Sequence, residues 1–493
     1  MTFTYRLVSG TFQLTISNGV ARLLSVVTMP VLTAWLSPQA YGVASLVGTL
    51  ISLASVFALV GIDVSYTRAY FSTKQPSGTS VERYCWRFAT LMSLLAAVFV
   101  AIAWWMTNRH SNELDQRLAI LLALGVVFSV ASTMAQTRAR LAGSYRALSL
   151  TIIATGVATS AASIGIALWW RQDALALLLP MVLGYLMPTV LLGAPSISEL
   201  KNPSGLTSRE GAALIKIGLA GIITAPMYWL LSSSDRWFLQ HYQGAEAVGI
   251  YSIGYNVAMV GMMVNTAVMA VWLPEASREY EHDQIRARTT LGTLMSRMIT
   301  AMALIWLMAT AAGGDIVHWL ANERFHSSAE FVPFIAAGVF FYGVSQLALY
   351  GLVLVNQFKW AALWWFVGGL VCTLLNVTLV SRHGGLGAAM TQGISFALIF
   401  IGILATSQYM YPLQLSWIRL ATVMVIIVAA GVFLASSWHA NAPISLLLKL
   451  PIGIAIAFVA GWIVAPDWCA RGIDYFRRDP SPQKCVGVRN GVS

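Results

Sequence analysis

The sequence predicts an all-α, polytopic membrane protein with about fourteen transmembrane helices: two pseudo-symmetric six-helix bundles plus two additional C-terminal helices. Three observations predict this fold class: an apolar composition, apolar runs of spanning length, and an internal repeat. Hydrophobic residues make up 58% of the 493 residues, charged residues only 10%, and the mean hydropathy is +0.71. Because soluble domains carry roughly 25% charged residues, this composition indicates a chain that lies mainly in the bilayer.

Apolar runs of roughly 20 residues or more recur along the chain, and each can cross about 30 Å of hydrocarbon as a helix. They lie at residues 8–36, 42–71, 84–107, 118–137, 147–170, 175–194, 212–236, 248–273, 290–312, 331–354, 361–381, 384–407, 417–436 and 445–465. The first run is too long for a signal-peptide core and carries Arg22 in its middle, so we interpret it as a retained helix.

Two pairs of segments repeat each other in outline. Residues 38–46 (PQAYGVASL) return as 245–253 (AEAVGIYSI), and 141–146 (LAGSYR) return as 354–359 (LVNQFK). The offset of about 210 residues far exceeds a solenoid unit, so the chain is read as a duplicated half. Six spans per half is an even number, which predicts a parallel repeat about an axis along the membrane normal.

The repeat divides the chain into five parts. They are an N-terminal six-helix bundle (1–195), a cytoplasmic linker (196–211), a C-terminal six-helix bundle (212–410), additional helices 13 and 14 (411–466), and a cytoplasmic tail (467–493). Lys and Arg are richer in the loops on the side of the N-terminus, which places both termini in the cytoplasm.

The net charge of +11 does not indicate nucleic acid, because the cations are spread over short loops with no soluble domain to present them. The four cysteines lack metal-ligand spacing, so we expect no disulfide and no metal. No Gly-Lys-Ser/Thr phosphate loop occurs, so we expect no nucleotide hydrolysis and no cofactor.

Ionisable side chains inside spans are costly, by at least about 2.5 kcal/mol at a helix centre, and they therefore identify candidate sites. Arg22 is the deepest, while Arg68, Lys216 and Arg297 lie near the cytoplasmic ends of their spans. Each of these last three can reach the interface with its long side chain. As a set with Arg22, the four cations instead describe a positive cavity that suits an anion, above all a phosphate.

Other features leave two interpretations each. Asp63, the acid that the sequence places well inside a span, either pairs with Arg22 or binds a coupling cation or proton. Asp235 and Arg236 form either a gate or interface pair or a solvated helix end. Pro30 and Pro226, in the first helix of each half, are either hinges or static kinks.

Several short motifs resemble one family. They are residues 32–42 (LTAWLSPQAYG), 234–239 (SDRWFL), 247–252 (AVGIYS), 324–329 (RFHSSA) and 384–389 (GGLGAA). Together they resemble the oligosaccharide flippases of bacterial polysaccharide synthesis, of the superfamily of multidrug, oligosaccharidyl-lipid and polysaccharide exporters.

This resemblance implies alternating access between two bundles in the bacterial inner membrane, and a cargo of oligosaccharide carried on undecaprenyl pyrophosphate for O-antigen, lipopolysaccharide or exopolysaccharide synthesis. It makes Arg22 a candidate to hold the pyrophosphate and the last two helices a groove for the lipid tail. Membrane lipid, a coupling proton or sodium ion, and a polymerase or export machinery are the implied partners.

Two alternatives stay open. A multidrug exporter of the same superfamily would be expected to carry cavity carboxylates for small cationic cargo. A membrane polysaccharide polymerase or ligase would be expected to carry a large outer loop with catalytic groups. The absence of long loops and of intramembrane acids favours a transporter that is not an enzyme.

Overall fold

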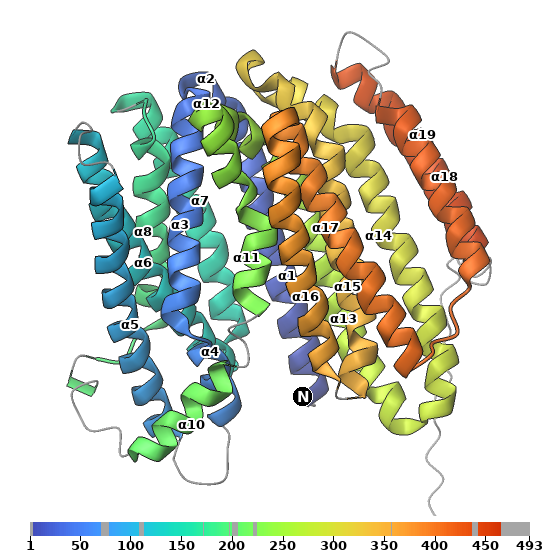
Figure 1. Ribbon diagram of the computed structural model, residues 1–493, viewed down its shortest axis with the longest axis horizontal. Helices are drawn as coiled ribbons and strands as arrows, with labels where there is room; N and C mark the ends of the chain where they lie inside the picture. The colour runs from blue at the N-terminus through green and yellow to red at the C-terminus, as the bar shows by residue number, and fades with distance from the viewer. Residues whose placement is uncertain are drawn as a thin grey trace, which may run out of the picture.

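The computed structural model describes residues 3–70, 78–107, 113–170, 172–196, 198–199, 206–219, 224–355, 357–435 and 442–464 (Figure 1). Among these residues there are helices and connecting turns and no β-strand, which confirms the all-α prediction. The expected tail at 467–493 and part of the expected linker lie outside the described residues.

The first half consists of helices from α1 to α8. They are α1 (Phe3–Val27), α2 (Met29–Trp35), α3 (Pro38–Leu59), α4 (Ile62–Ala69), α5 (Gly78–Thr107), α6 (Glu113–Leu141), α7 (Tyr145–Trp169) and α8 (Leu175–Leu192). A short amphipathic helix, α10 (Ser208–Leu219), precedes the second half.

The second half and the final hairpin follow. They are α11 (Thr224–Ser233), α12 (Asp235–Ala258), η1 (Met259–Gly261), α13 (Met262–His282), α14 (Gln284–Leu320), η2 (Glu323–Phe331), α15 (Val332–Leu354), α16 (Phe358–Leu375), the π-helical segment η3 (Asn376–Val380), α17 (Ser381–Met410), α18 (Trp417–Ala435) and α19 (Ala442–Val464).

Twelve continuous apolar segments of the described chain are long enough to cross a membrane. Two of them, 225–269 and 358–410, are 45 and 53 residues long, about twice what one crossing needs. Each contains a glycine with non-helical backbone, Gly244 (φ 84°) or Gly384 (φ 55°), at which the chain changes direction. The polytopic fold is confirmed, although the count of fourteen separate helices is not itself established.

The outer surface of the bundle is apolar. Large side chains such as Phe99 of α5 and Val432 of α18 are each 73% exposed. An exposed apolar surface of this extent is unfavourable in water and suits contact with lipid. The protein is therefore a multi-pass membrane protein.

The chain begins at one end of the bundle, near α4 and α10, while α2 and the contact between α3 and α12 lie at the opposite end (Figure 1). We call these the N-terminal end and the opposite end. The start of α3 is fixed by its sequence: Pro38 occupies the first turn and the Ser37 hydroxyl accepts a hydrogen bond from the Ala40 amide at 3.2 Å.

Helix α10 packs on α4 of the first half. The Ser65 hydroxyl donates to the Leu214 carbonyl at 2.6 Å, and Gly61 and Gly218 bring the two backbones together. A Cβ at either glycine would overlap the facing backbone, and Gly61 also has a positive φ of 70°. The segment between the halves is thus attached to the first half.

The final hairpin, α18 and α19, packs against α14 at the edge of the molecule (Figure 1). Lys449 Nζ of α19 lies 2.7 Å from Asp315 Oδ2 of α14, and the two side chains are only 2% and 3% exposed. The Ser445 hydroxyl also donates to Asp315 at 3.2 Å. Asp315 is thus a further acid within a spanning helix besides Asp63, and the expectation that named Asp63 alone is wrong, because α14 continues to Leu320, past the expected end at 312.

Candidate functional site

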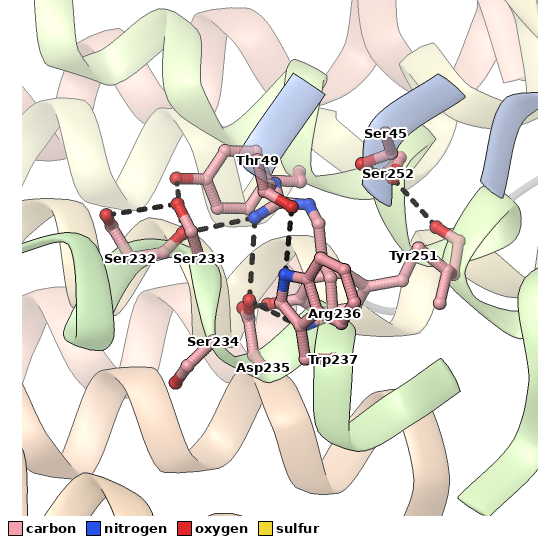
Figure 2. Close-up of polar contacts among 12 residues, drawn as sticks. Ser45, Thr49, Ser232, Ser233, Ser234, Asp235, Arg236, Trp237, Tyr251 and Ser252 are labelled. Carbon is pink, nitrogen blue, oxygen red and sulfur yellow. Dashed lines mark hydrogen bonds and ion pairs between the residues drawn. The ribbon is translucent and has the colours of Figure 1, made fainter. Parts of the chain in front are cut away.

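The two halves meet at the opposite end through their repeated loops. A Cβ on Gly42 would overlap the Ala245 carbonyl oxygen, and one on Gly249 would overlap the Pro38 carbonyl oxygen. Only glycine permits this approach of backbone to backbone. The hydroxyls of Ser45 and Ser252, 207 positions apart, share a hydrogen bond of 2.9 Å (Figure 2). Equivalent residues of the repeat therefore face each other and close this end.

Two tryptophans of the second half extend the contact toward the middle of the bundle. Trp237 Nε1 donates to the Thr49 hydroxyl at 3.1 Å, as Figure 2 shows. Trp229 Nε1 donates to the Thr49 carbonyl oxygen and lies 3.0 Å from the Ser52 hydroxyl oxygen. Because both indoles bond to α3, the halves are held together by directed hydrogen bonds as well as by packing.

Asp235 and Arg236 form a buried network at the start of α12 (Figure 2). Their carboxylate and guanidinium lie 3.4 Å apart, and the side chains are 3% and 7% exposed. The Tyr251 hydroxyl donates to Asp235 Oδ2 at 2.5 Å, and Arg236 donates to the Ser232 carbonyl at 3.1 Å. The pair is not a solvated helix end, because both residues are buried. Its role as a gate stays a prediction.

Tyr255 connects this network to the first half. Its ring lies 4.1 Å from the Arg236 guanidinium carbon, a cation–π contact, and its hydroxyl donates to the Ser232 carbonyl at 3.2 Å. Arg22 of α1 lies within electrostatic range of both Tyr255 and Tyr228. The deepest cation that the sequence identified is thus placed against the second half.

Arg22 is half-buried and has no hydrogen-bond or ion-pair partner among the residues that the structure describes. A guanidinium carries five N–H donors in a planar fork that fits a phosphate or carboxylate with two parallel hydrogen bonds. Arg22 is therefore chemically suited to bind an anion at the boundary between the halves.

The other three predicted cations do not gather around Arg22. Arg68, in the last turn of α4, and Lys216, in the last turn of α10, are exposed on two helices that pack together at the N-terminal end. Arg297 is half-buried on α14 of the second half. Since α1 packs mainly on α7 and α13, Arg22 lies on a different group of helices from Arg68, Lys216 and Arg297.

Asp63 lies in the first turn of α4 and is half-buried. Its electrostatic neighbours are Arg140 of α6 and Cys85 of α5. Among the described residues no ion pair joins it to Arg22, which leaves the coupling-ion interpretation as the remaining prediction for this carboxylate.

Both predicted hinge prolines lie at helix starts. Pro30 is in the first turn of α2, just after the break at Thr28 that ends α1, and Pro226 is in the first turn of α11. Proline is well tolerated there because no amide of that turn has a helical acceptor. At the offset of 207, however, Pro226 corresponds to Gly19, so the two prolines are not equivalent positions.

Two buried carboxamides near residues 232–234 were not predicted from the sequence. Asn376, in the π-helical segment η3, donates to the Ser234 hydroxyl at 3.4 Å, and both Asn376 and Gln392 are buried. A carboxamide in the middle of an apolar run was the available signal. Helix segments of π type are frequent at functional sites.

Comparisons with known proteins agree with this architecture. The chain has the fold of a lipid II flippase, MurJ, in an inward closed conformation: the TM-score is 0.71 at 10% identity, over 92% of this chain and 98% of that one. An inward-facing multidrug resistance transporter of the MATE family gives 0.57 at 11% identity, over 84% and 98%. A MATE transporter from Vibrio cholerae gives 0.55 at 11% identity, over 83% and 98%.

No curated protein matches the chain by sequence. The family model described as "Polysaccharide biosynthesis protein" matches residues 7–279, more than half of the chain, and includes Arg22, Asp63, Asp235 and Arg236. The superfamily expected from the motifs is confirmed by this match and by the shared fold. The chain belongs to the polysaccharide biosynthesis protein family.

Proposed function

We propose that this protein is a flippase that moves oligosaccharide repeat units linked to undecaprenyl pyrophosphate across the bacterial inner membrane by alternating access. The observation that carries the proposal is Arg22, a half-buried guanidinium without a partner among the described residues, within electrostatic range of Tyr228 and Tyr255 of the second half. The oxygens of a pyrophosphate would accept hydrogen bonds from the N–H groups of this guanidinium. Arg68, Lys216 and Arg297 would attract the anion from the cytoplasm at longer range.

Alternating access is supported by where the halves touch. Their hydrogen-bonded contact joins α3 to α11 and α12 at the opposite end, which would face outward if the N-terminus is cytoplasmic. Cargo would enter from the cytoplasmic leaflet, and separation of Ser45 from Ser252 would release it outside. The lipid tail would stay in the bilayer beside the α18–α19 hairpin.

The buried charges disfavour a multidrug exporter with the same fold. Cationic drugs need an available carboxylate, and two buried ones are already bonded, Asp235 to Arg236 and Tyr251 and Asp315 to Lys449, while Asp63 lies on α4 at the N-terminal end. Asp63 remains our candidate for coupling to a proton or sodium ion. A polymerase or ligase would need catalytic groups on an outer loop, whereas the polar groups described above are buried between helices.

The direct test is the location of lipid-linked repeat units in a strain that lacks this protein. We expect them to accumulate in the cytoplasmic leaflet, where an impermeant glycan-oxidising reagent added to intact spheroplasts does not reach them. Expression of the wild-type chain should restore labelling, and expression of the Arg22→Ala chain at equal abundance should not. Accumulation of unpolymerised units in the outer leaflet would instead indicate a polymerase. Unaltered glycan with increased drug sensitivity would indicate a multidrug exporter.

A further inference from the structure

A cavity of about 320 Å³ lies within the first half, between α1, α2, α7 and α8. Seven of its eleven lining residues carry a hydroxyl group, and none is charged. Helix α7 contributes four of the seven, and the others are Ser25, Thr28 and Tyr185. The volume is at the lower end of the range of ligand pockets, about 300–1,000 Å³.

Within the described part of the chain, four of the seven hydroxyls of this cavity lack the local hydrogen bond that the other three make. Serine and threonine in helices usually donate to the carbonyl one turn earlier, and Thr159 does so, to Thr155 at 2.8 Å. Thr155, Ser160, Ser163 and Tyr185 have no hydrogen-bond partner for their hydroxyls among the described residues. Ser163 is only 7% exposed and lines the cavity. The Thr155 hydroxyl oxygen is buried as well, and unpaired hydroxyls at such positions are costly, which indicates that something polar satisfies them.

The chemistry of the lining selects a class of ligand. An ion would be stripped of water with no countercharge in the cavity wall, and an apolar group would leave four hydroxyls unpaired. A neutral polyol avoids both problems: it carries no charge, and its hydroxyls can donate to and accept from the hydroxyls of serine, threonine and tyrosine. The cavity has room for one sugar ring with some water, and not for a whole repeat unit.

The cavity is next to the proposed anion site. Ser25 lies three residues after Arg22 on α1, about 4.5 Å along the helix axis, and its hydroxyl donates to the Arg22 carbonyl at 2.6 Å. On a lipid-linked glycan, the first sugar is bonded directly to the pyrophosphate. We propose that this cavity is the subsite for that first sugar, with α7 reading its hydroxyls while Arg22 holds the phosphate. The inference rests on the proposed function and adds a specificity site to it.

The test compares two lipids on the full-length protein in nanodiscs, with binding measured by native mass spectrometry. One is undecaprenyl pyrophosphate, and the other is undecaprenyl pyrophosphate carrying a single uncharged hexose. The variants are Ser163→Ala combined with Tyr185→Phe, and Thr155→Val, which keeps the side-chain shape. Thr133→Val is the matched control, because this α6 hydroxyl donates to the Ser129 carbonyl, away from the cavity.

We expect the double variant to bind the sugar-bearing lipid about tenfold more weakly and Thr155→Val about threefold more weakly. Both should bind the sugar-free lipid like the wild type, and Arg22→Ala should weaken both lipids. Equal effects on the two lipids, or none, would mean that water alone fills the cavity and would overturn the subsite while leaving the flippase proposal in place. Failure of the wild type to bind either lipid would overturn the flippase proposal and the subsite with it.

Discussion

Lys449 and Asp315 form an ion pair of 2.7 Å that joins the last helix to α14 inside the membrane-spanning region. Lys449 Nζ also donates to the Ala311 carbonyl at 3.3 Å, so the ammonium group has two partners on α14. Together with the Ser445 hydrogen bond to Asp315, this pair links the terminal hairpin to the second half at a defined register.

Lys449→Met should destabilise the protein by about 3–5 kcal/mol, because it leaves the Asp315 carboxylate buried without its cation. The double variant Lys449→Met with Asp315→Leu should recover most of that loss, since it leaves no charge. Thermal unfolding in detergent measures both, and Lys359→Met, at an exposed position of α16, is the control. A double variant as unstable as the single one would contradict the interpretation.

Removing the cation should also be costly for the buried pair of Asp235 and Arg236, and the exposed pair of Arg278 and Glu279 provides the comparison. Arg236→Gln should cost several kcal/mol of folding free energy, because Asp235 would lose its cation and keep only neutral donors, the Tyr251 hydroxyl and the backbone amide of residue 236. Arg278→Gln breaks a pair that is likewise adjacent in sequence, with Glu279, but Arg278 is 72% exposed, so we expect a change below about 1 kcal/mol. Similar losses for the two variants, measured by chemical denaturation, would mean that burial of the Asp235 pair has no energetic effect.

A disulfide should lock the contact between the halves. Ser45→Cys with Ser252→Cys, in a chain whose native cysteines are replaced, places two thiols where the hydroxyls now lie 2.9 Å apart. We expect rapid oxidation, loss of glycan export, and recovery on reduction. Full export by the oxidised protein would show that this contact does not open during transport.

Arg22 can be tested for the geometry of its hydrogen bonds as well as for its charge. Arg22→Lys keeps the charge but loses the bidentate fork, so export should fall several-fold, whereas Arg22→Gln should fall by tenfold or more. Arg68→Gln, at an exposed position of α4, should have a small effect. The rate of glycan labelling at the outer leaflet, at matched protein abundance, gives the comparison. Equal rates for Lys and Gln at position 22 would argue against a phosphate ligand.

The sequence predicted the spanning helices, the duplication and the deep position of Arg22, since these depend on local composition and on a repeat that spans the chain. It did not identify the neighbours of Arg22, because Tyr228 and Tyr255 are more than 200 residues away and only packing brings them close. Burial of Asp235 depends on helices that follow it in the chain. Asp315 was missed because the apolar run of the sequence ends near residue 312, whereas helix α14 continues to Leu320.

The contact at Gly42 and Gly249 has the form of an isologous interface, as in a two-fold homodimer: Gly42 meets Ala245 as Gly249 meets Pro38, and Ser45 meets its counterpart Ser252. A substitution at this contact disturbs the packing of both halves. Positions away from the contact can carry different residues in the two halves. The position of Arg22 illustrates the second case: its counterpart at an offset of 207 is Trp229, whose indole bonds to α3. The two equivalent positions therefore have different roles: Arg22 of α1 is a cation available to a ligand, whereas Trp229 of α11 joins the two halves by hydrogen bonds.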